Sequence, residues 1–131
     1  MTAGDAVAAR ARALVGVRFR PHGRGVAEGL DCVGLAAAAI GIADVRADYA
    51  LRGGSIATVE REVERVGLRR AGAVRKTGDL LVMSSGPGQL HLGIWTGAGL
   101  VHADGGLARV VERPGTPPWP VQSAWRVPEE N

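Results

Sequence analysis

The spacing of apolar residues changes at Gly78, and this change constrains the fold more than any other feature of the chain. Before Gly78, apolar side chains recur at helical spacing, and after it they alternate as in strands. Helices followed by short strands are typical of an α+β domain. The length of 131 residues fits a single domain over residues 1–131, large enough to bury a core without disulfide bonds.

Three helices are expected in the first half, over residues 2–16, 32–40 and 55–67. The second follows the N-cap residue Asp31 and is apolar on every side, so we expect it to be buried. Five short strands are expected in the second half, over residues 79–83, 90–95, 100–103, 108–112 and 124–127. Their short connections favour an antiparallel meander, with a rigid proline-rich loop before the last strand.

Composition excludes several classes of function. The net charge is +3, the basic residues lie in small scattered groups and 4% of residues are aromatic, so we expect no nucleic-acid partner and at most a modest attraction to polyanionic surfaces. No stretch reaches the ~18 apolar residues that a membrane span requires. The N-terminus lacks the basic region of a signal peptide, so we expect synthesis in the cytoplasm.

Cys32 is the single cysteine, which excludes a disulfide framework. A lone cysteine is commonly a small buried hydrophobe. Its place in the first turn of an expected helix favours a nucleophile instead, because the free N–H groups there stabilise a thiolate and an oxyanion. The neighbouring carboxylate of Asp31 acts in the opposite direction, although its charge is partly taken up by capping the helix.

A thiol nucleophile usually needs a histidine base, and His91 and His102 lie on consecutive expected strands. If the turn between these strands has an even length, His91 lies opposite Asp104 and diagonal to His102, all on one face. Either His102 or Asp104 could then orient the His91 ring, and spacing does not choose between them. The alternative is that both histidines are solvated or structural.

Two further alternatives concern metal and turn chemistry. Cys32, His91, His102 and Asp104 could together hold a zinc ion, but their spacing is not that of a metal motif, so no metal is expected. Asp79 follows Gly78 and is expected to serve a turn.

Four segments, taken together, resemble the NlpC/P60 family of cell-wall cysteine peptidases, and the likeness covers roughly residues 8–127. They are Leu30-Asp31-Cys32-Val33-Gly34-Leu35, Gly78-Asp79-Leu80-Leu81-Val82, His91-Leu92-Gly93-Ile94-Trp95 and Leu100-Val101-His102-Ala103. The chain is most similar to the short single-domain branch found among phage and gene-transfer-agent tail proteins. The aspartate-cysteine-x-glycine and histidine-x-glycine-isoleucine boxes are fairly specific as a pair.

The resemblance implies a papain-like α+β fold, with N-terminal helices packed on an antiparallel sheet of about five strands. It implies hydrolysis of peptidoglycan stem peptides, typically between D-γ-glutamyl and a diamino acid, without a cofactor. By match to the motifs, Cys32 is the nucleophile, His91 the general base and His102 the orienting residue. The backbone N–H of Cys32 would contribute to the oxyanion hole.

The sequence departs from the family before and after the cysteine. Phe19 stands where the family usually has a tyrosine whose hydroxyl reaches the active site, and Val33 stands where serine is common. We expect Phe19, His22 and Asp31 to lie at the substrate-binding site. The alternative is a non-catalytic tail-assembly or wall-binding module of the same fold. Either protein would reach the wall through a phage-like particle or through lysis.

Overall fold

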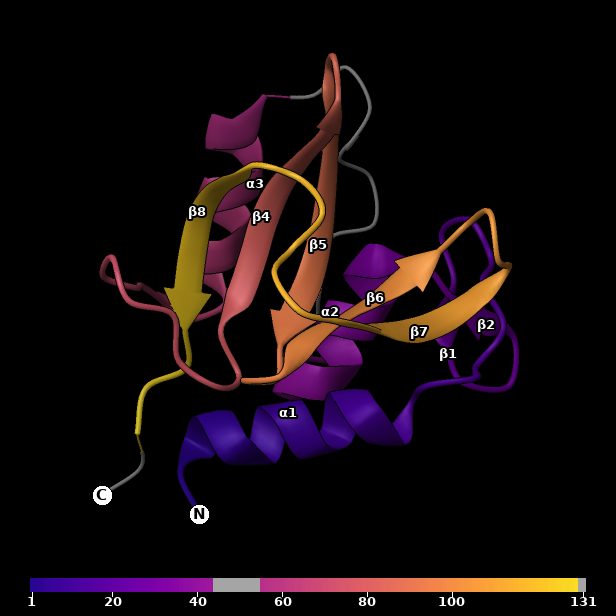
Figure 1. Cartoon of the computed structure of the whole chain (residues 1–131), viewed down its shortest axis with the longest axis horizontal. Helices are drawn as coiled ribbons and strands as arrows, with labels where there is room; N and C mark the ends of the chain where they lie inside the picture. Colours follow the sequence, from indigo (N-terminus) through magenta and orange to yellow (C-terminus); the bar gives the residue numbers. More distant parts are fainter. Residues whose placement is uncertain (44–54, 130–131) are drawn as a thin grey trace.

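A computed structural model describes residues 1–43 and 55–129 of the chain. In chain order, its elements are α1 (Ala3–Ala13), β1 (Arg24–Gly25), β2 (Gly29–Leu30), α2 (Cys32–Ile40), α3 (Ile56–Arg65), β3 (Arg69–Arg70), β4 (Leu80–Gly86), β5 (Gln89–Trp95), β6 (Gly99–Asp104), β7 (Arg109–Pro114) and β8 (Val121–Arg126). The helices precede the long strands, which confirms the expected α+β class (Figure 1). The expected single domain also includes residues 44–54 and 130–131, which lie outside the described residues.

Side-chain caps set the starts of α1 and α3. Thr2 Oγ1 accepts the backbone N–H of Asp5, and Asp5 Oδ2 accepts that of Thr2, each at 3.0 Å, so the capping box of α1 is formed. Ser55 caps α3 through the N–H of Ala57.

No helix in the described ranges is long and apolar enough to cross a membrane.

The second helix, α2, is buried along most of its length, which confirms the prediction from its apolar composition. Its side chains Leu35 and Ala39 have no exposed surface. It packs between α1 on one side and strands β5 and β6 on the other. The buried face of α1, including Val7 and Ala11, belongs to the same core cluster.

The six-stranded sheet has the order β3-β8-β4-β5-β6-β7, and its neighbours are antiparallel. The predicted meander is correct for β4 to β7 and wrong for β8, which pairs with β4 and not with β7. The proline-rich connection carries the chain back across the sheet (Figure 1). The extra strand, β3, is a two-residue edge strand beside β8 and is too short to give a sequence signal.

The two faces of the sheet are covered differently. The inner face packs on the helices through a large core that includes Leu92, Ile94 and Val101. The outer face carries a smaller cluster of Leu81, Met83 and Leu100, against which Trp95 and Trp119 pack. Figure 1 shows the β7–β8 connection in front of the sheet, with α2 and α3 behind it.

The sheet splits between β5 and β6, and this split positions the site. The two strands pair at Ile94–Val101 and Trp95–Leu100, whereas β4 and β5 pair along the length of both strands. Before Ile94, β5 is paired only with β4, and after Val101, β6 is paired only with β7, so β5 and β6 diverge (Figure 1). Residues on either side of the split are therefore free of ladder hydrogen bonds to each other.

Candidate active site

Cys32 is the first residue of α2, and its position is fixed by the cap before it. Asp31 Oδ1 accepts the backbone N–H of Gly34 at 2.8 Å, so the helix begins at Cys32 as predicted. The Cys32 side chain is buried, with 6% of its surface exposed. Its sulfur meets the backbone N–H of Leu92, the residue that follows His91 on β5.

Burial, together with a smaller effect of the Asp31 carboxylate, raises the pKa of the Cys32 thiol to about 12. The Leu92 backbone and the Arg24 guanidinium act in the opposite direction but do not overcome burial. The expectation that the helix N-terminus holds Cys32 as a thiolate is therefore wrong for this structure. The effect of Asp31 has the predicted sign.

Asp31 organises the backbone around the cysteine. Arg24 Nη1 donates to Asp31 Oδ1 at 2.7 Å, and the backbone N–H of His22 donates to Asp31 Oδ2 at 3.1 Å. Both carboxylate oxygens are thus occupied by the protein. Asp31 therefore shapes the site by holding the hairpin β1–β2 against the first turn of α2.

His91 and His102 meet across the split in the sheet. His91 Nε2 lies 3.0 Å from His102 Nδ1, and the ring centroids are 5.1 Å apart at 83°. The register at Ile94–Val101 is the even-loop register, which makes His102 diagonal to His91. Asp104 Oδ1 accepts the N–H of Leu107 and serves the β6–β7 turn. Of the two residues that spacing left open, His102 is the one that contacts the His91 ring.

Burial also controls the protonation of this pair. Burial, together with a smaller effect of the nearby His102, lowers the pKa of His91 to about 4, while Asp104 opposes the shift. Burial lowers the pKa of His102 as well, with Asp104 again opposing. Both imidazoles are therefore neutral at neutral pH.

The Cys32 sulfur contacts β5 at the backbone N–H of Leu92, the residue that follows His91 in the chain. In the part of the chain that the structure describes, no hydrogen bond joins the Cys32 thiol to the His91 ring. The arrangement is a neutral thiol close to a neutral, histidine-supported imidazole.

Phe19 and His22 are the other two residues expected at the substrate-binding site. Phe19 is half-buried, its backbone bonds to Ala108, and its ring faces Gly105 in the turn after β6. The His22 residue is exposed and has φ 60°, with its backbone joined to Asp31. Their role in substrate binding stays a prediction.

Sequence reasoning missed Trp119. Its ring lies 5.0 Å from that of His91 and 5.3 Å from that of His102, at 75° and 89°. The available signal was an aromatic residue within the proline-rich loop between β7 and β8. Its partners could not be deduced, because the path of that loop across the sheet has no sequence signature.

Two other interpretations from the sequence, the turn role of Asp79 and the zinc site, can be compared with the structure. Asp79 is fully buried, accepts the N–H of Lys76 and pairs with Arg126 through both oxygens at 2.8 Å, which confirms its expected turn role. Within the described residues, no group of three or more His, Cys, Asp or Glu residues could hold a metal ion, so the zinc alternative lacks a ligand set.

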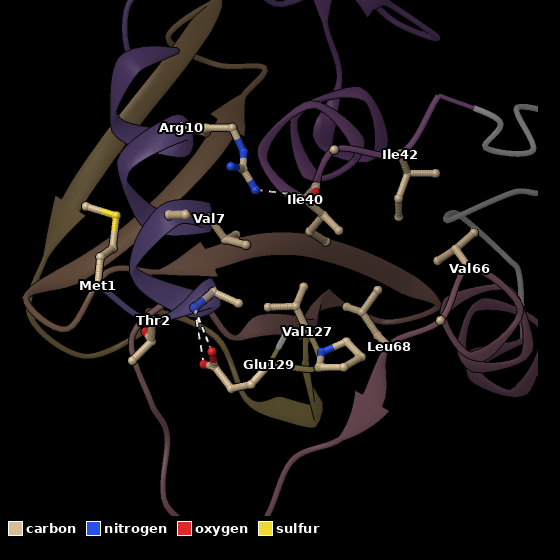
Figure 2. A pocket seen from close by; sticks show the side chains of 15 residues that line it. Met1, Thr2, Val7, Arg10, Ile40, Ile42, Val66, Leu68, Val127 and Glu129 are labelled. Atoms are coloured by element: carbon tan, nitrogen blue, oxygen red, sulfur yellow. Dashed lines mark hydrogen bonds between the residues drawn. The ribbon is translucent and has the colours of Figure 1, made fainter. Parts of the chain in front are cut away.

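A cavity of about 580 Å³ lies between α1 and the C-terminal segment, where Glu129 accepts the N–H of Ala3 (Figure 2). None of the residues expected at the catalytic or substrate-binding site lines it.

Comparisons with known proteins identify the fold. NlpC2 from Trichomonas vaginalis superposes with a TM-score of 0.70 at 18% identity, over 99% of this chain and 48% of that one. The peptidoglycan hydrolase RipB from Mycobacterium tuberculosis gives 0.64 at 24% identity, over 95% and 64% of the two chains. RipD from the same organism, a non-catalytic NlpC/P60 domain protein adapted to peptidoglycan binding, gives 0.57 at 17% identity, over 95% and 96%.

These likenesses define the class of structure as the NlpC/P60 fold, as the sequence motifs predict. The chain spans less than half the length of NlpC1 and NlpC2 from Trichomonas vaginalis. No family model matches the sequence. No curated protein matches it either. Proteins with this fold include both a peptidoglycan hydrolase and a non-catalytic protein, so the site must decide between them.

Proposed function

We propose that this chain is a cysteine endopeptidase that cleaves peptidoglycan stem peptides between D-γ-glutamyl and a diamino acid. The observation that carries the proposal is the 3.0 Å contact between His91 Nε2 and His102 Nδ1, beside the residue whose backbone meets the Cys32 sulfur. A cysteine at a helix start and a base held by a third residue form the usual arrangement of a thiol hydrolase. The NlpC/P60 fold of a peptidoglycan hydrolase supports the substrate class.

His102 orients His91 by accepting a hydrogen bond. When His102 Nδ1 accepts the Nε2–H of His91, the Nδ1 of His91 is unprotonated and can accept a proton. The low pKa of His91 keeps the ring in this neutral form at neutral pH. His91 thus acts as a general base toward a neutral thiol, and no resting ion pair is required.

Hydrolysis then proceeds through an acyl-enzyme. Cys32 Sγ attacks the carbonyl carbon as His91 takes the thiol proton, and the carbonyl electrons pass to oxygen. The oxyanion lies at the backbone N–H groups at the start of α2, beginning with that of Cys32. The C–N bond breaks as His91 returns the proton to the leaving amine. Water, deprotonated by His91, releases the acid product and restores the thiol.

Digestion of purified sacculi and of a synthetic stem peptide tests this function. We expect new amino groups at the diamino acid, loss of this release in Cys32→Ser and His91→Ala, and retention in Arg61→Gln, an exposed change on α3. Circular dichroism should show the same fold in all four proteins. Release by Cys32→Ser or by His91→Ala at the wild-type rate would overturn the mechanism.

A non-catalytic wall-binding module is the second candidate, and three features favour it. The thiol is buried with a raised pKa, it makes no hydrogen bond to His91 within the described residues, and Phe19 lacks the hydroxyl that the family motif supplies. RipD combines this fold with peptidoglycan binding and no catalysis. Retention of the wild-type protein on sacculi, without any release of amino groups, would establish this function instead.

Carriage to the wall by a phage-tail-like assembly or by lysis belongs to the same proposal. Its support is the resemblance of the motifs to the short phage and gene-transfer-agent branch. Co-purification with tail proteins from particle preparations tests carriage by a particle, and recovery of the chain solely outside such particles would contradict that route and favour lysis.

A further inference from the structure

Trp119 closes the outer side of the histidine pair. Its ring lies edge-to-face with those of both His91 and His102, and these two rings are edge-to-face with each other. The three rings therefore form a closed triangle in which each plane is set by the other two. Trp119 belongs to neither β7 nor β8 and reaches this position from their connection.

The connection that carries Trp119 is itself anchored. Pro118 and Pro120 flank the tryptophan and restrict its backbone, and the Pro120 carbonyl accepts the N–H of Ser84 of β4 at 2.9 Å. The indole packs on the outer cluster, which includes the fully buried Leu100. The ring is therefore held from two sides, independently of the histidines.

The histidine pair needs such a support because the sheet does not provide one. Ladder pairing between β5 and β6 ends at Ile94–Val101, so no backbone hydrogen bond fixes the distance from His91 to His102. Water entering this gap would compete for the hydrogen bond between His91 Nε2 and His102 Nδ1. A large apolar ring over the gap removes that competition.

We propose that Trp119 is a positioning residue of the candidate active site, which holds His91 against His102 and keeps water from the pair on the outer face. The inference rests on the proposed function for its effect on catalysis, but its effect on the imidazoles needs no substrate.

The charges around the pair determine how the two imidazoles respond to removal of the indole. Asp104 of β6 favours the protonated form of both rings, His102 disfavours it at His91, and Arg113 of β7 disfavours it at His102. The Cys32 thiol is neutral at neutral pH. Burial is the largest cause of the low pKa of His91, so entry of water should raise this pKa toward its ordinary value. The acid limit of catalysis should rise with it, because the general base must be neutral.

Three variants test the role of Trp119. Trp119→Leu removes the ring, and Trp119→Phe keeps an aromatic edge. Trp95→Leu is the matched control, since Trp95 packs on the same cluster and, within the described residues, makes no ring contact with a histidine. The chain has 3 histidines, so their ring protons can be followed separately by NMR from pH 3 to 9. Stem-peptide hydrolysis is measured over the same range.

In Trp119→Leu we expect the His91 titration and the acid limb of kcat to move upward together by about one pH unit or more. We expect kcat to fall about tenfold at neutral pH with little change in KM, because the indole contacts the base. Trp119→Phe should show a smaller shift in the same direction, and Trp95→Leu none. An unchanged His91 titration in folded Trp119→Leu, or an equal shift in Trp95→Leu, would overturn the inference.

Two further outcomes are also decisive. If Trp119→Leu does not fold, the titration of Trp119→Phe carries the test, and a curve identical to wild type would refute the role. If wild-type protein releases no amino groups from any stem peptide while the His91 titration still shifts, the proposed hydrolysis fails and the support of the pair by Trp119 stands.

Discussion

The two halves of the candidate site are built in opposite ways. The cysteine half is local, since the hairpin β1–β2, the cap Asp31 and the first turn of α2 lie within residues 22–34 and are joined through backbone groups. The histidine half brings together β5, β6 and the β7–β8 connection through ring contacts at a gap in the sheet. The nucleophile therefore has a rigid position, while the base depends on distant packing.

The largest expected effect concerns the reactivity of the cysteine half. With a thiol pKa near 12, Cys32 should react with iodoacetamide at neutral pH about a thousandfold more slowly than the same cysteine in the unfolded chain. The rate should keep rising up to about pH 12. Mass spectrometry of timed reactions from pH 6 to 11, with and without denaturant, measures it.

His91→Ala provides the control for this labelling. Because no hydrogen bond joins the thiol to the His91 ring in the described ranges, the variant should label at the wild-type rate. Rapid labelling of wild type that levels off below pH 8.5 and is lost in His91→Ala would show an ion pair. The two halves would then already be coupled before substrate binds.

The next effect tests the rigidity of the cysteine half. A methyl group at Gly34 would overlap the backbone carbonyl oxygen of Gly23, which lies against the first turn of α2 and cannot rotate away. We expect Gly34→Ala to lower the free energy of unfolding by about 3 kcal/mol, measured by urea denaturation. Gly72→Ala is the matched control, because a methyl group there meets no atom. Equal stability of the two variants would contradict the close contact.

A pH effect of intermediate size belongs to the histidine half. His91 becomes protonated below about pH 6.5 in the unfolded chain but only below about pH 4 in the folded protein. The free energy of unfolding should therefore fall as pH falls from 6.5 to 4. The loss should be on the order of 2 kcal/mol, since the ring is partly exposed. In His91→Gln, urea denaturation at several pH values should show a shallower dependence. Parallel curves for the two proteins would refute a buried neutral His91.

The cysteine half could be predicted from the sequence because its determinants are adjacent in the chain. Asp31 before an apolar run specifies a capped, buried helix, and the structure places its first turn at Cys32. The same pattern could not reveal that burial raises the pKa of the thiol. Burial depends on the strand packed opposite, which a local pattern does not contain.

For the histidine half, the sequence predicts the strand register but not the packing of Trp119 that supports the two rings. Alternation and an even turn gave the correct relation of His91 to His102. The return of the chain from β7 to β8 across the sheet, which brings in Trp119, follows from no period or motif. Nor does alternation show where a ladder ends, and the end of pairing at Ile94 is what lets the rings meet.

A last substitution tests whether the histidine half tolerates an added methyl group better than the cysteine half does. A methyl group at Gly93 of β5 would lie 2.6 Å from Cδ1 of Leu100, a side chain that can turn within the outer cluster, and 3.1 Å from the carbonyl oxygen of Val101. We therefore expect Gly93→Ala to cost about 1 kcal/mol in urea denaturation, less than Gly34→Ala. Since Leu100 and Trp119 share that cluster, the displaced side chain should also move the His91 titration slightly upward. A loss of stability as large as that of Gly34→Ala would show that both halves are equally rigid.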